Sequence, residues 1–325
     1  MISLPAISLW KREGGMVGME EGKHTVWTHL LLTLVTFSWG FNNIAMKVGF
    51  TQLSAQQFGG LRMLLAFPFM LYLAFFMPGR AKFTARDMLG IAVVGLAGMG
   101  LFQTLFPIGI DETSAPLGGI LMATMPIHVV VISLVFRLEK PKLKSIGGIL
   151  LTIVGLALIT FSAGESASDG DTTIRGIFFV VIAELGYGIN TTFLRSYMKR
   201  YPPLQVTGLA MAVSVVLYEL VYLSEMKALV SSQISATAWL TTIYSGLIAF
   251  FLANLLWNLS VKNIGSTQVS VYGNLPPVVV LILSAVIFGD LLNLPQMLGS
   301  LVILAGVVLV QYPGKSSKVV EPVDS

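Results

Sequence analysis

The sequence predicts an all-α polytopic membrane protein with ten transmembrane helices in two inverted five-helix repeats. The chain has 325 residues, of which 55% are apolar and only 11% are charged, whereas a typical soluble domain is about 25% charged. The apolar residues form continuous runs rather than the alternating pattern of a transmembrane barrel. The second half of the chain also repeats residues of the first half at a nearly constant spacing.

Ten apolar runs are long enough to cross the hydrocarbon core, which needs about 20 residues per helix. The spans are expected near 26–47, 55–77, 88–109, 114–137, 144–162, 174–195, 203–223, 237–260, 266–289 and 295–312. The segments between them carry charges and turn formers, as in "MPGRAKFTARD" and "SEMKALVSSQ". We therefore divide the chain into an N-terminal lead (1–25), a first five-helix repeat (26–162), a second five-helix repeat (174–312) and a tail (313–325).

The basic residues predict the orientation of these spans. With the N-terminus inside, 16 of the 20 lysines and arginines lie on the cytoplasmic side, as the positive-inside rule requires. Lys47, Arg175 and Lys227 then lie outside, and Arg62 lies within a span. We expect a multi-pass protein of the cell membrane with both termini in the cytoplasm. The net charge of +4 is explained by this topology, so it does not predict a nucleic-acid partner.

Two polar strings in oily sequence, "SWGFNNIAMK" and "LGYGINTTFLR", are copies of each other. At an offset of 148, Gly40, Asn42 and Lys47 correspond to Gly188, Asn190 and Arg195. Farther along, an offset of 151 relates the pairs Gly95/Gly246, Pro126/Pro277, Gly148/Gly299 and Gly155/Gly306. The last two pairs are expected to serve close helix packing in the fifth and tenth spans. Because each copy holds five spans, an odd number, the second copy must cross the membrane in the opposite sense. Such inverted repeats are typical of secondary transporters, whose binding site lies near the midplane between the halves.

The chain resembles the drug/metabolite transporter superfamily, and within it the EamA-type exporters. The resemblance rests on "WGFNNIAMK" with Leu61–Arg62, and on two segments that close the halves, "MATMPIHVVVISLVFRLEKPKLKSIGGILLTIVGLALI" and "GNLPPVVVLILSAVIFGDLLNLPQMLGSLVILAGVVLV". It covers roughly residues 28 to 312. The departures are Tyr187 where the first half has Trp39, and Asp290 where the family usually has glutamate. The resemblance implies ten helices in two repeats, and export or exchange of small metabolites by alternating access.

Ionisable groups inside spans are the first candidates for a functional site, because each costs about 2.5–3.5 kcal/mol on insertion scales. Arg62 stays charged, so it needs an anion, which is either a substrate group or Glu219 in a structural pair. Glu184 lies near the middle of the sixth span, with no cation close in sequence. We expect it to carry a coupling proton, to pair with a cationic substrate group, or to bond a neighbouring helix.

Other polar and aromatic residues complete the candidate site. His128 is the second candidate for proton coupling, and the alternative is a histidine that a neighbouring group satisfies. The predicted substrate-binding residues are Trp39, Asn42, Arg62, Glu184, Tyr187, Asn190, Tyr272 and Asn274. Asn43, Gln103 and Asn254 are further amides in the spans, and such amides join helices or orient polar substrates.

The same inventory argues against an enzyme and against a cofactor. The chain has no cysteine and three histidines, and its charged groups are too sparse to assemble a metal cluster or a catalytic triad. We expect a secondary transporter that exports a small metabolite, such as an amino acid, by alternating access. Its partners would be that substrate, the lipid bilayer and protons, and it would be a monomer or a homodimer. The alternatives are an exchanger of anionic metabolites (sugar phosphates or organic acids), which would suit Arg62, and a non-transporting membrane enzyme or scaffold.

Overall fold

The computed structural model describes residues 20–136, 143–165, 173–229, 234–264, 269, 271–289 and 291–311. These residues form helices and turns, with no strand among them. Six helical stretches are long and apolar enough to cross a membrane: Ala55–Phe75, Ala85–Asp111, Ala115–Ile132, Ile174–Met198, Pro203–Val221 and Ala236–Asn263. Shorter apolar helices cover Ile146–Leu158, Leu275–Ile287 and Leu294–Gly306. The all-α membrane fold is confirmed, and the count of ten spans stays a prediction.

The helices of the first half follow the expected order. They are α1 (Glu20–Phe50), α2 (Ala55–Phe75), α3 (Ala85–Gly95), the π-helical η2 (Leu96–Gly100), α4 (Leu101–Asp111), α5 (Ala115–Met122), α6 (Met125–Val135) and α7 (Leu143–Glu165). The expected third span is thus one helical stretch with a π-helical segment in its middle. The expected fourth span is interrupted by a turn at Ala123 and Thr124, just before Pro126.

The second half repeats this pattern. It comprises α8 (Ile174–Met198), α9 (Pro203–Val221), α10 (Leu223–Leu229), α11 (Ala236–Ile243), the π-helical η3 (Tyr244–Leu252), α12 (Ala253–Ile264), the 3₁₀ turn η4 (Val271–Asn274), α14 (Leu275–Ile287) and α15 (Leu294–Gln311). The stretch "SEMKALVSSQ", which was expected to be a break between spans, lies between α9 and α11 and contains the short helix α10.

Side-chain caps begin several helices at the expected boundaries. Ser54 and Gln57 form a reciprocal capping box at the start of α2. The hydroxyls of Thr84, Thr173 and Ser235 accept bonds from backbone N–H groups in the first turns of α3, α8 and α11. These bonds satisfy N–H groups that have no partner within their own helix.

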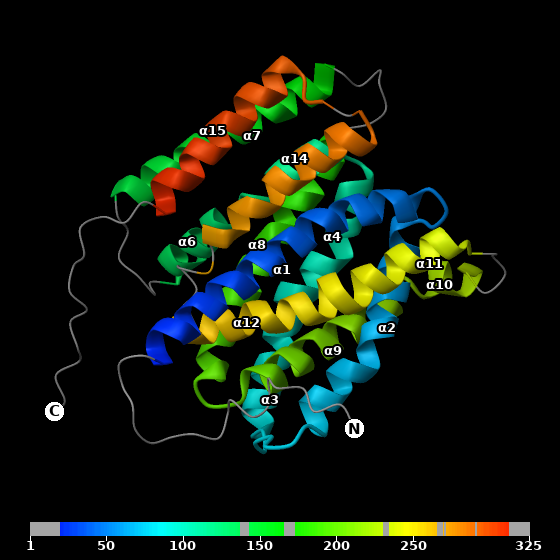
Figure 1. The fold of residues 1–325 in the computed structure, drawn as a ribbon, viewed down its shortest axis with the longest axis vertical. Helices are drawn as coiled ribbons and strands as arrows, with labels where there is room; N and C mark the ends of the chain where they lie inside the picture. The colour runs from blue at the N-terminus through cyan, green and yellow to red at the C-terminus, as the bar shows by residue number, and fades with distance from the viewer. Residues whose placement is uncertain are drawn as a thin grey trace.

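Contacts between helices follow a two-fold pattern. α1 packs on α14 as α8 packs on α6, and α1 packs on α12 as α8 packs on α4. α2 and α9 pack on each other, and so do α7 and α15, which lie side by side at one edge of the bundle (Figure 1). Each contact in one repeat thus has an equivalent in the other, and α2–α9 and α7–α15 each join a helix to its own copy. This pattern supports a repeat that is related by two-fold symmetry.

Glycines allow the closest of these contacts, as expected for the fifth and tenth spans. A Cβ atom at Gly155 would lie 2.7 Å from the carbonyl oxygen of Gly299, and one at Gly306 would lie 2.6 Å from that of Gly148. The two contacts are equivalent under the offset of 151. The prediction that these glycines serve helix packing is confirmed.

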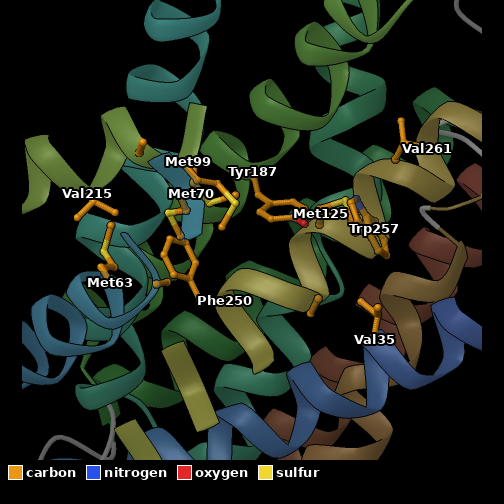
Figure 2. Close-up of a cluster of buried hydrophobic side chains, with 14 of the residues drawn as sticks. Val35, Met63, Met70, Met99, Met125, Tyr187, Val215, Phe250, Trp257 and Val261 are labelled. Atoms are coloured by element: carbon orange, nitrogen blue, oxygen red, sulfur yellow. The ribbon is translucent and has the colours of Figure 1, made fainter. Parts of the chain in front are cut away.

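The core is rich in methionine and aromatic side chains. Figure 2 shows part of this cluster, in which Tyr187 lies between a group that contains Met99, Met70 and Phe250 and a group that contains Met125 and Trp257. Both repeats contribute to it, so the cluster joins the two halves beside the candidate site.

Candidate functional site

A central cavity lies where the two repeats meet. Its volume is about 50 Å³, counted as the space open to the centres of water molecules, and a single water needs at least about 10–15 Å³ on this measure. Its lining residues are Trp39, Asn42, Arg62, Phe102, Gln103, Phe106, Met122, Met125, Glu184, Tyr187, Ala249, Phe250, Asn254, Gly273 and Pro276. Five of the eight predicted binding residues are among them: Trp39, Asn42, Arg62, Glu184 and Tyr187.

Arg62 is a buried cation with neutral partners. Its guanidinium donates to the side-chain oxygen of Gln103 and, over 3.3 Å, to the hydroxyl of Ser245. The ring of Phe250 lies 5.8 Å from its central carbon atom. Its Nε has no hydrogen-bond partner among the described residues. The positive charge is therefore held by dipoles and a ring face, and it remains available to an anion that enters the cavity.

The expected pair between Arg62 and Glu219 is not formed. The described ion pairs are Arg175–Glu112 and Arg200–Asp87. The Oε1 atom of Glu219 is buried without a hydrogen bond and lies 3.1 Å from where a Cβ would stand at Gly60. Residues two positions apart, such as Gly60 and Arg62, point to opposite sides of a helix. Glu219 therefore faces the wrong side of α2.

Glu184 is a buried carboxyl group that has neither a hydrogen bond nor an ion pair with the described residues. Its exposed fraction is 3%. Tyr187, one turn farther along α8, donates instead to the side-chain oxygen of Asn254 over 3.1 Å. Asn254 in turn donates to the carbonyl oxygen of Phe250 over 2.6 Å. Because burial of an unsatisfied polar group is costly, the Glu184 carboxyl is poised to bind a group that the cavity admits.

Aromatic rings form one wall of the cavity beside this carboxyl group. The ring of Trp39 lies 5.7 Å from that of Tyr187 and 4.8 Å from that of Trp257. Phe102 lies 5.2 Å from Tyr187. The indole N–H of Trp39 donates to the carbonyl oxygen of Ala249 over 3.0 Å, which fixes the ring. Ring faces attract cations, so the aromatic wall and the Glu184 carboxylate both favour a cationic group.

Asn190 was expected in the cavity beside its copy, Asn42, but it does not line it. Its Cβ packs 2.8 Å from where a Cβ would stand at Gly98. The equivalent of Gly98 in the second half is Ala249, so the two contacts differ. Asn190 is buried, and the close approach of α8 to η2 holds it outside the cavity.

Tyr272 and His128 also lie away from the lining. The Tyr272 hydroxyl lies 2.6 Å from Nδ1 of His29, and the two rings stack. The Cβ of His128 packs 3.1 Å from where a Cβ would stand at Gly188, and its Nδ1 has no partner among the described residues. The side chain of Asn274 lies outside the described part of the chain.

Two cavity residues, Gln103 and Asn254, were recognised as amides in the spans but were not placed in the predicted site. They are equivalent under the offset of 151. Gln103 holds Arg62, and Asn254 holds Tyr187. The sequence repeat could have identified Gln103 and Asn254, because a site on a two-fold axis is lined by equivalent positions of both copies.

Comparison with known proteins gives the family. The family model described as the EamA-like transporter family matches residues 26–161 and 174–312. The uncharacterized transporter YyaM of Bacillus subtilis is 24% identical over 272 residues, covering 82% of this chain and 87% of that protein. The WAT1-related protein At2g37460 of Arabidopsis thaliana is 25% identical over 269 residues, covering 74% of this chain and 70% of that protein.

Two further similarities concern a named exporter and the fold. A probable terminal-alkyne amino-acid exporter of Streptantibioticus cattleyicolor is 26% identical over 228 residues, covering 70% of this chain and 74% of that protein. A solved crystal structure superposes with a TM-score of 0.60 at 13% identity, over 87% of this chain and 96% of the other. At that identity the superposition supports the fold alone.

The family match spans both repeats and most of the chain, and the names of the relatives are those of transporters rather than enzymes. Together with the apolar helices, it identifies a multi-pass membrane transporter. The chain belongs to the EamA-like transporter family, within the drug/metabolite transporter superfamily.

Proposed function

We propose that this chain is a secondary transporter that exports a small amphipathic metabolite, an amino acid or a similar compound, across the cell membrane by alternating access. Both termini lie in the cytoplasm, the protein works as a monomer or a homodimer, and Glu184 couples transport to protons. One observation carries the choice of substrate. A single cavity presents to whatever enters it the Arg62 guanidinium, with neutral partners, and the Glu184 carboxyl group, which has no partner among the described residues.

Each of the two charged side chains binds a different end of the substrate. Arg62 and Gln103 bind a carboxylate, since charge-assisted hydrogen bonds are stronger than neutral ones. Glu184 and the aromatic wall bind an ammonium group. Apolar atoms of Phe106, Met122 and Met125 surround the remainder of the substrate. A dipolar molecule satisfies both charges at once, and the name of the Streptantibioticus relative, an amino-acid exporter, supports this reading.

The alternative is an exchanger of anions, such as sugar phosphates or organic acids. Arg62 favours it, because the planar guanidinium matches the geometry of phosphate groups as well as that of carboxylate groups. Glu184 opposes it, because an ionised carboxylate in the same cavity repels an anion. The dipolar substrate is therefore the stronger proposal.

A binding screen on the purified full chain tests the proposal. Thermal unfolding is measured with L-amino acids, with their methyl esters, which lack the carboxylate, with their N-acetyl derivatives, which lack the ammonium group, and with organic acids and sugar phosphates. We expect stabilisation by some free amino acids and by neither derivative. Stabilisation by sugar phosphates or organic acids alone would replace the proposal with the anion exchanger.

Two variants assign the ends of the substrate. Arg62→Gln should weaken stabilisation by the free amino acid, and so should Glu184→Gln, because each variant removes one charged partner of the substrate. Arg175→Gln and Glu219→Gln are matched controls, because they remove the same charges outside the cavity. Loss of binding in the controls as well would show a general effect of charge rather than recognition in the cavity.

A further inference from the structure

The two copies of one interface differ, although the repeat makes them equivalent. We call the contact of α8 with η2 and α6 the α8 seam, and the contact of α1 with η3 and α14 the α1 seam. The offsets of 148 and 151 map one onto the other. The central cavity lies between them, since Glu184 and Tyr187 of α8 and Trp39 and Asn42 of α1 all line it.

The α8 seam is closed by backbone contact. A Cβ at Gly186 would lie 2.8 Å from the carbonyl oxygen of Gly98, and a Cβ at Gly98 would lie 2.9 Å from the backbone nitrogen of Asn190. Ion pairs also tie both ends of this helix pair: Arg175 bonds Glu112 at one end, and Arg200 lies 2.9 Å from Asp87 at the other. Exposed ion pairs contribute only about 0–1 kcal/mol each, so the glycine contacts are the main reason that this seam is tight.

The contact of α1 with η3 has none of these features, although α1 stays close to α14, where a Cβ at Gly40 would lie 3.0 Å from the carbonyl oxygen of Pro276. Ser38 and Ala249 stand where the α8 seam has Gly186 and Gly98, so the helix backbones cannot approach as closely. Trp27 and Gln52 stand where it has Arg175 and Arg200, which removes the cations of both ion pairs.

A groove runs along the outside of the α1 seam. Its volume is about 430 Å³. It is lined by Phe37, Ser38, Phe41, Tyr244, Val278, Val279, Ile282 and Leu283. About half of the surface of Phe37, Phe41 and Val278 is exposed there.

A single layer of helix separates this groove from the central cavity. On α1, Ser38 faces the groove while the next residue, Trp39, lines the cavity. On η3, Tyr244 faces the groove while Phe250 lines the cavity. The Tyr244 hydroxyl donates to the carbonyl oxygen of Ser38 over 3.0 Å and lies 2.9 Å from the Ser38 hydroxyl. π-helical segments such as η3 are frequent at functional sites.

From these observations we propose that the α1 seam is a lateral gate. α1 moves away from η3, while it keeps its contact with α14, and opens the central cavity sideways to the bilayer; the α8 seam stays closed. The Ser38–Tyr244 contact is the latch that holds the gate shut. An amphipathic substrate can then exchange its apolar part with the lipid phase.

The test measures access to the cavity and needs no substrate, so its failure is distinguishable from failure of the proposed function. Met122→Cys, in the cysteine-free chain, places one thiol on the cavity wall. Its labelling rate in proteoliposomes is measured with bilayer-soluble N-cyclohexylmaleimide and with a charged methanethiosulfonate that stays in water. Adding Tyr244→Phe removes the latch hydroxyl and keeps the ring beside Phe41. We expect labelling by the maleimide to rise about fivefold, the factor that corresponds to one hydrogen bond, and labelling by the charged reagent to stay unchanged.

Tyr222→Phe in the same Met122→Cys background is the matched control. It removes a tyrosine hydroxyl that bonds the carbonyl oxygen of Thr104, away from the α1 seam, and should leave both rates unchanged. Ser38→Ala, which removes one of the two latch contacts, should give a smaller rise and serves if Tyr244→Phe does not fold. No rise in either latch variant, a rise with the charged reagent alone, or an equal rise in Tyr222→Phe would overturn the lateral gate.

Discussion

At the scale of residues, the candidate site is defined by two buried charged side chains that have no charged partner in the part of the chain that the structure describes. Arg62 and Glu184 both line the central cavity and are both almost fully buried. In a bilayer such groups persist where they face a cavity or a partner. Their identity could be predicted from the sequence, because a charge inside an apolar run is visible without a structure. Their partners could not be predicted. Whether Glu219 of α9 lies on the same face of α2 as Arg62 depends on how the two helices pack.

Glu184→Gln tests proton coupling at this scale. The amide keeps the shape of the side chain but cannot ionise, so accumulation of the substrate driven by an imposed pH gradient should vanish. Because the variant also loses the charge that binds the ammonium group, passive exchange is measured at a raised substrate concentration, and there it should survive. The measurement is uptake of an amino acid found by the binding screen, in liposomes with and without the gradient. A gradient response equal to that of the wild type would refute the coupling role, and Glu219→Gln, outside the cavity, is the control.

At the scale of elements, the helix order was predictable from apolar runs and punctuation, and the irregular segments were not. η2 and η3 contain no proline that would mark an irregular turn, and their glycines are of a kind found in many of the other spans. α10 lies in a charged stretch that reads as a loop. Its helix is short and follows directly on α9.

Glycine positions at helix crossings give a prediction for stability. A Cβ at Gly246 would collide with the backbone carbonyl of Arg62, just as one at Gly95 would lie 2.6 Å from the carbonyl oxygen of Ala210, the equivalent position. We expect Gly246→Ala to destabilise the protein by about 1–3 kcal/mol, the usual cost of overpacking. Thermal unfolding in detergent measures this cost. Gly147→Ala is the control, since its Cβ would meet the nearest atom at 3.5 Å, and an equal loss there would contradict the packing argument.

The contact between α4 and α8 gives a prediction for pH. Arg175 bonds the carboxylate of Glu112, just after the end of α4, and holds the pKa of that group below its usual value. The contribution to stability is therefore present above the unfolded pKa of about 4.3 and is lost as the pH falls through the lowered folded value. Because Arg175 is 67% exposed, the effect should stay below about 1 kcal/mol.

The measurement compares the thermal stability of the wild type and of Glu112→Gln from pH 7 down to about pH 3, a range that brackets the carboxyl titration. The difference between the two proteins should shrink at acidic pH. A constant difference would mean that the Glu112 carboxylate does not stabilise the fold through its charge.

At the scale of the whole molecule, the repeat organises both the fold and the site. The mirrored contacts of α1 and α8, and the equivalent amides Gln103 and Asn254, place the cavity where the two copies meet. The sequence offset predicted this arrangement, because glycine, proline and asparagine matches keep one register over several helices. It could not predict which member of each pair would face the cavity, since a single difference, such as Gly98 in one copy and Ala249 in the other, changes how closely two helices can approach.

Two copies that are inserted in opposite senses allow a cavity between them to open to each side of the membrane in turn. The most direct test labels equivalent positions, Lys140→Cys and Leu291→Cys, which the offset of 151 relates. Leu291 is 81% exposed, so its thiol should react readily. In intact cells, a membrane-impermeant maleimide should label Leu291→Cys from outside and should label Lys140→Cys only after the cells are opened. Labelling of both positions from the same side would contradict the inverted repeat and the transporter that we build on it.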